Sequence, residues 1–390
     1  MSISCDTHSD VLLIGGGLAG LSTALHLAQA GLHVRLLEKE SYPRHKVCGE
    51  YISNEVLPYL NSLGIDPFAA GATRLQRCLL SAESGRSVEA PLPLGGFGLS
   101  RYRLDTLLYQ AACQAGADIR QAEAVSLALD EQPARVRSRR HGDFTADLLI
   151  GSYGKRSRVD KELGRPFIQH KTPYLGVKAH YAGDFPEDLV ALYCFPGGYC
   201  GVSKVEEGRI NICYLAHQRT FRKYQNLDAY ARAVLHQNPA LAEILNRVEP
   251  LFARPLTISQ ISFAPKGQAH AQLLLAGDAA GMIHPLCGNG MGMAIASAQL
   301  LSTYIIEHVR SPNPQHRSLA QAYSRAWQAQ FRRRLQFGRL FNALFYRPAL
   351  FEWAISTLSR APWALPFFIR QTHGDFLPPN PLNRKTTETC

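Results

Sequence analysis

The chain has 390 residues and carries 42 Lys and Arg against 31 Asp and Glu, which gives a formal net charge of +11. Hydrophobic residues make up 46% and charged residues 19%, a composition that excludes a disordered or low-complexity chain. The length allows two or three domains, at roughly 100–200 residues per domain. No aromatic-basic platform or nucleic-acid-binding motif accompanies the positive charge, so we expect no nucleic-acid partner.

The cysteines point to a reducing compartment. The chain has nine of them without a CxxC pair, and the closest two, Cys194 and Cys200, flank a Gly/Pro turn. We therefore expect reduced thiols, no disulfide framework and no metal site. Residues 1–10 contain two acids and no Lys or Arg, unlike the basic start of a signal peptide. Together these features predict a cytoplasmic protein.

The N-terminal segment has the pattern of strand, glycine turn, helix and strand. A continuous apolar run over 10–14 precedes the glycine turn 15–20, apolar residues at helical spacing follow over 21–30, and a second apolar run over 33–38 ends in an acid. Apolar runs without alternation indicate a parallel sheet covered on both faces. The glycines suit a tight turn, the approach of a pyrophosphate and close helix packing, and the acid is spaced to bind a ribose diol. The predicted dinucleotide-binding residues are Gly15, Gly17, Leu18, Ala19, Gly20, Glu38 and Lys39.

A second motif lies about 240 residues later. A predicted strand over 272–276 ends in Gly277-Asp278, and a glycine-rich turn over 288–292 opens a predicted apolar helix over 293–306. Gly277-Asp278 alone could be a simple turn. Paired with the N-terminal motif, it resembles the FAD-binding motif of the superfamily that holds geranylgeranyl reductases and aromatic hydroxylases of the p-hydroxybenzoate hydroxylase fold. The resemblance implies FAD as the cofactor, with Asp278 on the ribityl hydroxyls and Gly290 and Met291 at the flavin pyrimidine ring.

The segments between the two motifs extend this resemblance. Arg44, Cys48 and Gly49 match a Cys-Gly segment whose cysteine lies near the flavin ring in geranylgeranyl reductases, although a buried apolar thiol is the alternative for Cys48. Arg101 opens a predicted helix and would reach the flavin phosphate or ribityl chain, unless it is a surface charge. Val125, in a predicted strand over 122–129, is a further expected FAD contact.

One site departs from the hydroxylase pattern. The hydroxylases carry an Asp-Gly pair that contacts FAD and pyridine nucleotide, and this chain has Tyr153-Gly154 instead. The missing acid puts hydroxylase-type handling of NADPH in doubt.

The resemblance implies an α/β fold: a glutathione-reductase-like FAD-binding Rossmann domain, an inserted antiparallel β-sheet substrate domain and a helical C-terminal region. Alternating strand patterns over 174–181, 190–195, 201–206 and 209–215, with a helix over 226–246 and a strand pair over 251–263, fit the inserted sheet. The expected domains are 1–73, 97–165 and 264–310 for FAD binding, 74–96 and 166–263 for the substrate sheet, and 311–390 for the helical region.

The last 80 residues interleave aromatic side chains with a run of arginines over 332–347. Packing onto the core is one interpretation of this pattern. The other is a peripheral membrane contact through helices that are apolar on one face and basic on the other.

The functional prediction follows from these features. Cys48-Gly49, the missing acid and the apolar C-terminal third favour an FAD-dependent reductase of C=C bonds in a hydrophobic small molecule. The alternative is an FAD-dependent monooxygenase of an aromatic or polyketide-derived substrate. A halogenase is disfavoured because its Trp-x-Trp-x-Ile motif is absent, and nothing favours a non-catalytic regulator. Cys48, His284 and Tyr199 are the catalytic candidates, and the expected reductant is NAD(P)H or a reduced electron carrier.

Overall fold

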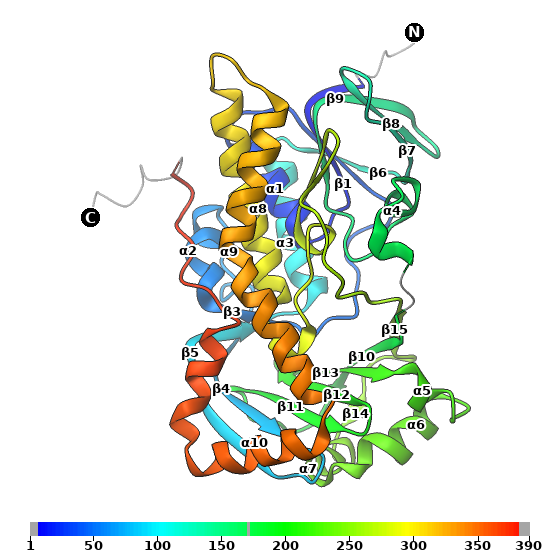
Figure 1. The fold of residues 1–390 in the computed structure, drawn as a ribbon, viewed down its shortest axis with the longest axis vertical. Helices are drawn as coiled ribbons and strands as arrows, with labels where there is room; N and C mark the ends of the chain where they lie inside the picture. The colour runs from blue at the N-terminus through cyan, green and yellow to red at the C-terminus, as the bar shows by residue number, and fades with distance from the viewer. Residues whose placement is uncertain (1–6, 170–171, 382–390) are drawn as a thin grey trace.

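The computed structural model describes residues 7–169 and 172–381, which form a mixed α/β fold built on two sheets. The first sheet and its helices occupy the upper half of Figure 1, and the second sheet lies below them. Residues 1–6 lie outside the described chain, and so does most of the segment 1–10 whose lack of basic residues is unlike a signal peptide. Cys5 and Cys390 also fall outside the described residues. The seven described cysteines have free thiols.

The first sheet contains the strand–turn–helix–strand unit that the sequence predicts. The path of this eight-stranded sheet runs β16-β17-β9-β1-β2-β6, and β1 pairs in parallel with both β2 and β9. The five residues of β2 are all buried, as expected for a strand covered on both faces. The strands are β1 (His8–Ile14), β2 (Val34–Glu38), β6 (Asp118–Gln121), β7 (Ala124–Ala128), β8 (Ala134–Ser138), β9 (Gly142–Gly151), β16 (Ala269–His270) and β17 (Leu273–Leu275).

Helices cover this sheet and carry the main hydrophobic core. α1 (Leu18–Gln29) packs against α3 (Arg101–Gln114) and α8 (Gly290–Val309), and α8 packs against α9 (His316–Phe345). The short α2 (Leu57–Ser62) and α4 (Arg158–Glu162) flank this layer. α8 begins at Gly290, three residues earlier than predicted, so the glycine-rich segment forms its first turn. Gly292 fits there because a Cβ would lie 2.3 Å from Asn289 Oδ1.

The second sheet is the inserted one, and it is mixed rather than purely antiparallel. Its path runs β14-β10-β13-β12-β11-β4-β5-β3, with β15 on β10, and β4 pairs in parallel with β11. These two strands belong to separate excursions of the chain, so no hairpin forces them to run in opposite directions. The strands are β3 (Tyr51–Ser53), β4 (Thr73–Ser81), β5 (Ser87–Gly98), β10 (Tyr174–Ala182), β11 (Leu189–Phe195), β12 (Gly198–Lys204), β13 (Ile210–His217), β14 (Glu249–Pro250) and β15 (Leu256–Ser259).

The predicted helix over 226–246 is divided. α6 (Leu227–Val234) and α7 (Pro239–Leu245) are separated at Asn238, whose side chain caps α7 by accepting from the Leu241 N–H at 3.2 Å. Pro239 cannot continue the preceding helix but suits the first position of a new one. α5 (Gln218–Phe221) precedes this pair.

The C-terminal region is helical, as predicted. After the long α9, Pro348 starts α10 (Pro348–Arg360), and α11 (Leu365–Arg370) follows. Both short helices pack on β5 at the lower left of Figure 1. Residues 371–381, called the C-terminal strap here, then return toward the first sheet's helices, and the Leu377 N–H donates to the Glu55 carbonyl at 2.7 Å. Among the described helices, none combines the length and apolarity needed to cross a membrane.

Candidate active site

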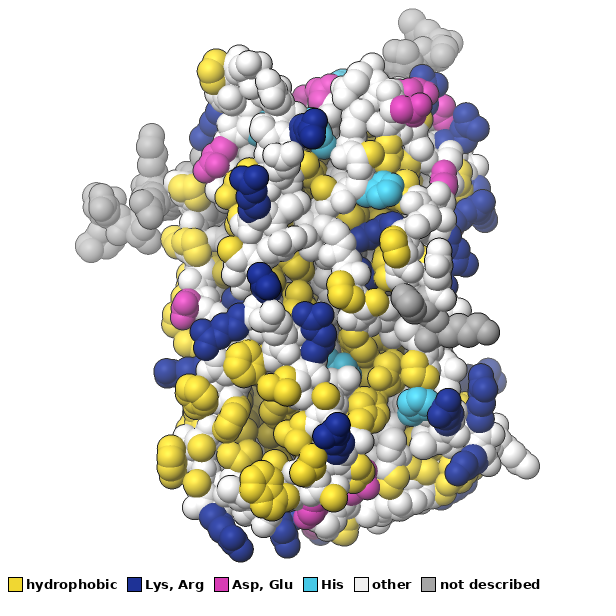
Figure 2. All heavy atoms as spheres, in the orientation of Figure 1, with side chains coloured by type: hydrophobic (Ala, Val, Ile, Leu, Met, Phe, Trp, Pro, Cys, Tyr) yellow, Lys and Arg dark blue, Asp and Glu magenta, His cyan; other side chains and the backbone are white. Residues whose placement is uncertain are grey.

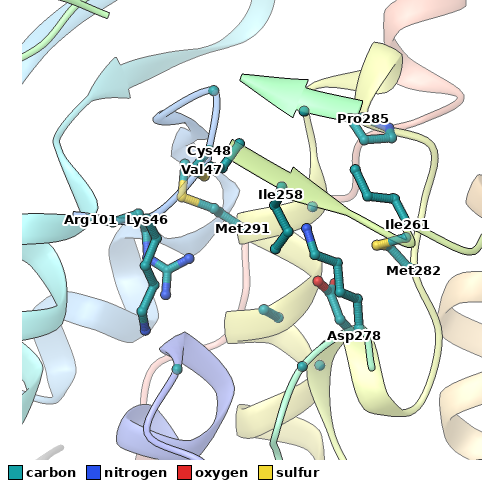
Figure 3. Close-up of a pocket in the computed structure, with 18 of the residues that line it drawn as sticks. Lys46, Val47, Cys48, Arg101, Ile258, Ile261, Asp278, Met282, Pro285 and Met291 are labelled. Carbon is teal, nitrogen blue, oxygen red and sulfur yellow. The ribbon is translucent and has the colours of Figure 1, made fainter. Parts of the chain in front are cut away.

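One continuous cavity of about 1790 Å³ joins the two halves of the molecule. Its walls come from the glycine turn after β1, the end of β2, the loop 44–50, the start of α8, the second sheet and the C-terminal helices. All the predicted cofactor residues line it except Gly20, which packs behind the turn. Figure 3 shows part of this cavity, with Arg101 and Lys46 on one side of the view, Asp278 on the other, and Cys48 close to Met291.

At the first-sheet end, the glycine turn has the geometry that a dinucleotide needs. Gly15 has φ +103°, which a side chain would disfavour, and a Cβ on Gly20 would lie 2.1 Å from the Gly15 carbonyl oxygen. The Glu38 carboxylate ends β2 beside this turn. Its Oε2 accepts from the Gly16 N–H at 2.8 Å and lies 3.0 Å from Arg44 Nη2. These bonds hold Glu38 at the cavity wall.

Two helix N-termini face the cavity without side-chain caps. α1 begins after Gly17 and α8 after Asn289, and neither capping residue makes a side-chain bond to its helix. Gly17, Leu18, Gly290 and Met291 all line the cavity. The first N–H groups of a helix need acceptors, and the positive end of the helix dipole favours an anion. The two ends therefore fit a pyrophosphate at α1 and an electron-rich ring at α8, as FAD would provide.

Arg101 is a fixed, largely buried cation rather than a free surface charge. Its guanidinium makes two bonds to Asp105, at 2.7 and 2.9 Å, and Lys46 Nζ donates to the same carboxylate at 2.7 Å. Burial alone would raise the pKa of Asp105, but the charges of Arg101 and Lys46 hold that pKa below its ordinary value. Asp105 thus holds the Arg101 guanidinium in a fixed position at the cavity wall. The guanidinium lies near the glycine turn, since a Cβ built on Gly17 would be 3.9 Å from Arg101 Nη2.

The loop that carries Cys48 is fixed from below by the second sheet. Asn211 Nδ2, on β13, donates to the Gly49 carbonyl at 2.8 Å and to the Cys48 carbonyl at 3.3 Å. The next residue, Glu50, has φ +54° and is fully buried. Cys48 lines the cavity and is partly exposed, and Figure 3 shows it close to Met291 at the start of α8.

Glu50 forms a buried charged cluster beneath this loop. Its Oε1 accepts from Lys178 Nζ at 2.6 Å and from the Arg101 N–H at 2.8 Å, and its Oε2 accepts from His180 Nε2 at 2.7 Å. Burial would raise the pKa of Glu50, but the His180 hydrogen bond and the Lys178 charge lower it overall. A charged carboxylate therefore joins β10 to the Cys48 loop and to the start of α3.

Tyr153 takes the place of the acid that the hydroxylases carry. It lines the cavity, and its hydroxyl donates to Asp160 Oδ1 at 3.1 Å. Asp160 also receives the Ser157 N–H at 3.0 Å and Arg165 Nη1 at 2.7 Å, so its carboxylate is committed to local structure. The nearby aspartate therefore does not restore a carboxylate at the cavity wall.

The two other catalytic candidates lie in different surroundings. Tyr199 lines the cavity and is buried, and burial holds its pKa well above the ordinary value. His284 is not among the described residues that line the cavity. Its ring packs at a tilt against Phe263, with ring centroids 4.3 Å apart, and its Nδ1 accepts from the Leu286 N–H at 3.3 Å. Burial lowers the pKa of His284 to about 4, so the ring is neutral at pH 7.

The structure reveals a polar pair that the sequence did not suggest. Tyr51 and His373 both line the cavity, and the Tyr51 hydroxyl lies 3.3 Å from His373 Nε2. His373 Nδ1 lies 2.9 Å from the Ile369 carbonyl oxygen, which can only accept, so Nδ1 carries the proton and Nε2 accepts from Tyr51. Residues 322 positions apart meet here, and no local motif announces the pair.

Lys155 is a second residue that the sequence motifs do not single out, although it follows Tyr153-Gly154. It lines the cavity, and burial lowers its pKa, with the Asp278 charge partly opposing that shift. Its backbone is tied to the Gly-Asp motif, since Lys266 Nζ donates to both the Lys155 and the Asp278 carbonyls, at 2.8 and 2.7 Å. The cavity thus has a further cation near Asp278.

Beyond the Cys48 loop the cavity becomes apolar. This part, called the apolar chamber here, lies between the second sheet and the C-terminal helices, with Tyr51 and His373 on its wall. Its aliphatic and aromatic lining residues are Leu80, Leu92, Val190, Leu192, Leu215, Ile258, Ile261, Met282, Leu286, Phe341, Leu365, Phe368 and Ile369. Such a lining fits a hydrophobic substrate.

Comparisons with known proteins agree with this geometry. A family model described as "FAD binding domain" matches residues 8–336. "Conditioned medium factor receptor 1" of Dictyostelium discoideum is 26% identical over 404 residues, covering 93% of this chain and 78% of that protein. "Digeranylgeranylglycerophospholipid reductase 2" of Methanopyrus kandleri is 24% identical over 351 residues, covering 86% of each chain. The structure of the flavin-dependent brominase Bmp2 aligns with a TM-score of 0.77 at 17% identity, covering 94% of this chain and 93% of that one.

Proposed function

The chain belongs to the FAD-binding domain family, and on that premise we propose that it is a reductase that saturates carbon–carbon double bonds of a lipophilic substrate. The observation that carries this proposal is the continuity of the cavity, which runs from the two uncapped helix ends past Cys48 into the apolar chamber. The similarity to a digeranylgeranylglycerophospholipid reductase adds support.

In this proposal the residues of the first sheet hold FAD. Glu38 binds the adenosine ribose, the start of α1 and Arg101 bind the phosphates, Asp278 binds the ribityl chain, and the start of α8 faces the ring. When bound and reduced, FAD supplies a hydride. We propose NAD(P)H or a reduced electron carrier as the source of its electrons.

Reduction of a C=C bond also needs a proton, and Tyr51 is the group that we propose to supply it. A hydride adds to one carbon of the double bond and the Tyr51 O–H gives its proton to the other, so the product gains two hydrogens. Burial raises the pKa of Tyr51, which keeps the hydroxyl protonated at physiological pH. His373 orients the hydroxyl at rest, and water returns a proton to the phenolate after turnover.

The chemistry is tested by the mass of the product. Protein supplied with NADPH, NADH or dithionite is incubated with a geranylgeranyl phospholipid, with menaquinone and with a panel of aromatic acids, in the presence of labelled oxygen gas. A reductase adds hydrogens to one of the lipids. Incorporation of labelled oxygen into an aromatic product would overturn the proposal in favour of a monooxygenase.

The apolar chamber is tested separately from FAD binding. Ile369→Trp adds bulk to the chamber at a residue that is not one of the predicted FAD contacts, so FAD content should stay at the wild-type level while lipid turnover falls at least about tenfold, or about 1.4 kcal/mol of barrier. Unchanged turnover would show that the substrate does not occupy the chamber.

A further inference from the structure

The outer face of the C-terminal helices exposes large aromatic side chains that the core does not use. We call this surface the aromatic face; it comprises Leu350, Trp353, Trp363, Phe367 and Phe368. Trp363 is 81% exposed, Trp353 67% and Phe367 63%. In Figure 2, hydrophobic side chains gather over the lower left of the molecule, where Figure 1 places α10. Such a concentration of exposed apolar groups marks a binding surface.

The inner side of the same helices is already occupied. Phe351, Ile355 and Leu365 are buried in the hydrophobic cluster formed with the second sheet. The exposed aromatic residues therefore lie on a different side of these helices from the residues that pack on the core. A second, exposed apolar side of this kind indicates a surface that binds a partner.

The charge around the aromatic face is mostly positive. Residues 331–370 contain seven arginines, of which Arg334 is buried against Glu55, and a single acid, Glu352, which lies near Glu83 of the neighbouring β4–β5 turn. That acid is already engaged, since Ser84 Oγ donates to Glu352 at 2.7 Å and Arg86 lies 3.7 Å away. Arg347 and Arg360 bound α10, and Arg370 ends α11. An apolar surface rimmed by arginines complements an anionic one.

The aromatic face also adjoins the apolar chamber. Phe368 lines the cavity and is at the same time 42% exposed, and its neighbours Leu365 and Ile369 line the cavity as well. One short helix therefore forms both the wall of the chamber and part of the exposed face. A ligand that is bound at the aromatic face would therefore have only a short path past this helix into the chamber.

From these observations we propose that the aromatic face docks on the surface of an anionic phospholipid bilayer. The aromatic side chains insert among the acyl chains and headgroups, and the arginines contact the headgroup phosphates, as in interfacial amphipathic helices. The second sheet and the chamber then lie against the membrane. This proposal concerns binding and stands whether or not the chamber reduces a lipid.

Vesicle binding by the full-length, FAD-loaded protein tests this surface. We expect co-sedimentation with vesicles of phosphatidylcholine and phosphatidylglycerol, weaker binding to phosphatidylcholine alone, and weakening by salt. Tryptophan fluorescence reports the contact directly, because Trp327 is 3% exposed in the core whereas Trp353 and Trp363 lie on the aromatic face. Docking should shift the emission to shorter wavelength.

Two variants with matched controls define the residues responsible. Trp363→Ser combined with Phe367→Ser should lower the partition coefficient at least about tenfold. The control Val309→Ser, at a 49% exposed apolar residue at the end of α8, should leave it unchanged. Arg360→Gln should lower it about fivefold on anionic vesicles only, the effect of about 1 kcal/mol per basic residue. Arg137→Gln, on β8, should have no effect.

Three results would overturn the proposal. The first is no binding to anionic vesicles, and the second is equal loss of binding in Val309→Ser and in the aromatic variant. The third is self-association in analytical ultracentrifugation that the aromatic variant abolishes, which would assign the face to a second copy of the chain.

Discussion

Replacing Glu50 by Gln removes the negative charge from the buried cluster and leaves Lys178 without a counter-ion. Both side chains are fully buried, and Glu50 accepts from Lys178 at 2.6 Å, from His180 at 2.7 Å and from the Arg101 N–H at 2.8 Å. A Gln amide has one acceptor oxygen and so cannot serve donors on both sides. Breaking a buried ion pair from one side costs about 3–5 kcal/mol of unfolding free energy.

The test compares the single and the double variant with wild type by urea denaturation. Glu50→Gln should lose about 3–5 kcal/mol, whereas Glu50→Gln combined with Lys178→Met, which removes both charges at similar volume, should recover at least half of that loss. Measurements with and without saturating FAD separate folding from cofactor binding, since Glu50 also lines the cavity. A loss below about 1 kcal/mol in the single variant, or a double variant no better than the single, would refute the reasoning.

The remaining predictions concern pH and the cofactor site. Because the folded-state pKa of Glu50 lies below the ordinary 4.5, its contribution to stability is present above pH 4.5 and is lost as the pH falls through the lowered value, so wild type should lose more stability on acidification than Glu50→Gln. Glu38→Ala should weaken FAD binding in a fluorescence titration by about 1.5–3 kcal/mol, and unchanged affinity would make Glu38 a strand-end charge only. Cys48→Ser should keep FAD content and melting temperature but slow single turnover about tenfold or more; full turnover with lost stability would mark a structural thiol.

The elements that sequence reasoning predicted well are those defined by local patterns. The segment from β1 to β2 combines two apolar runs, a glycine turn and a helix within about 30 residues, and the structure has each element within a few positions of the prediction. The membership of the FAD-dependent oxidoreductase superfamily, expected from the two glycine motifs, is confirmed by the family match over residues 8–336.

The differences come from contacts between distant parts of the chain. The parallel pairing of β4 with β11 depends on how two excursions meet, and no turn signal encodes it. The earlier start of α8 has the same origin, because Asn289 at its start donates to Glu55 Oε1 at 3.1 Å and to the Thr372 carbonyl at 3.0 Å, and a Cβ on Gly292 would lie 2.7 Å from Glu55 Oε1.

In the candidate site, too, the residues marked by local motifs were predictable, whereas those brought together by distant segments were not. Glu38 and Asp278, which the two glycine motifs single out in the sequence, both line the cavity. His284 follows Asp278 closely in the sequence, yet its ring turns away and packs on Phe263. Tyr51 and His373 could not be paired from the sequence, since the C-terminal strap brings them together only in the folded chain.

The most direct test of the central claim is anaerobic mixing of the chemically reduced, FAD-loaded protein with a geranylgeranyl phospholipid dispersed in anionic vesicles. We predict that the absorbance of oxidised flavin returns without oxygen, and that the recovered lipid gains two hydrogens for each flavin oxidised. A flavin that stays reduced until oxygen is admitted, together with an unchanged lipid, would contradict the account.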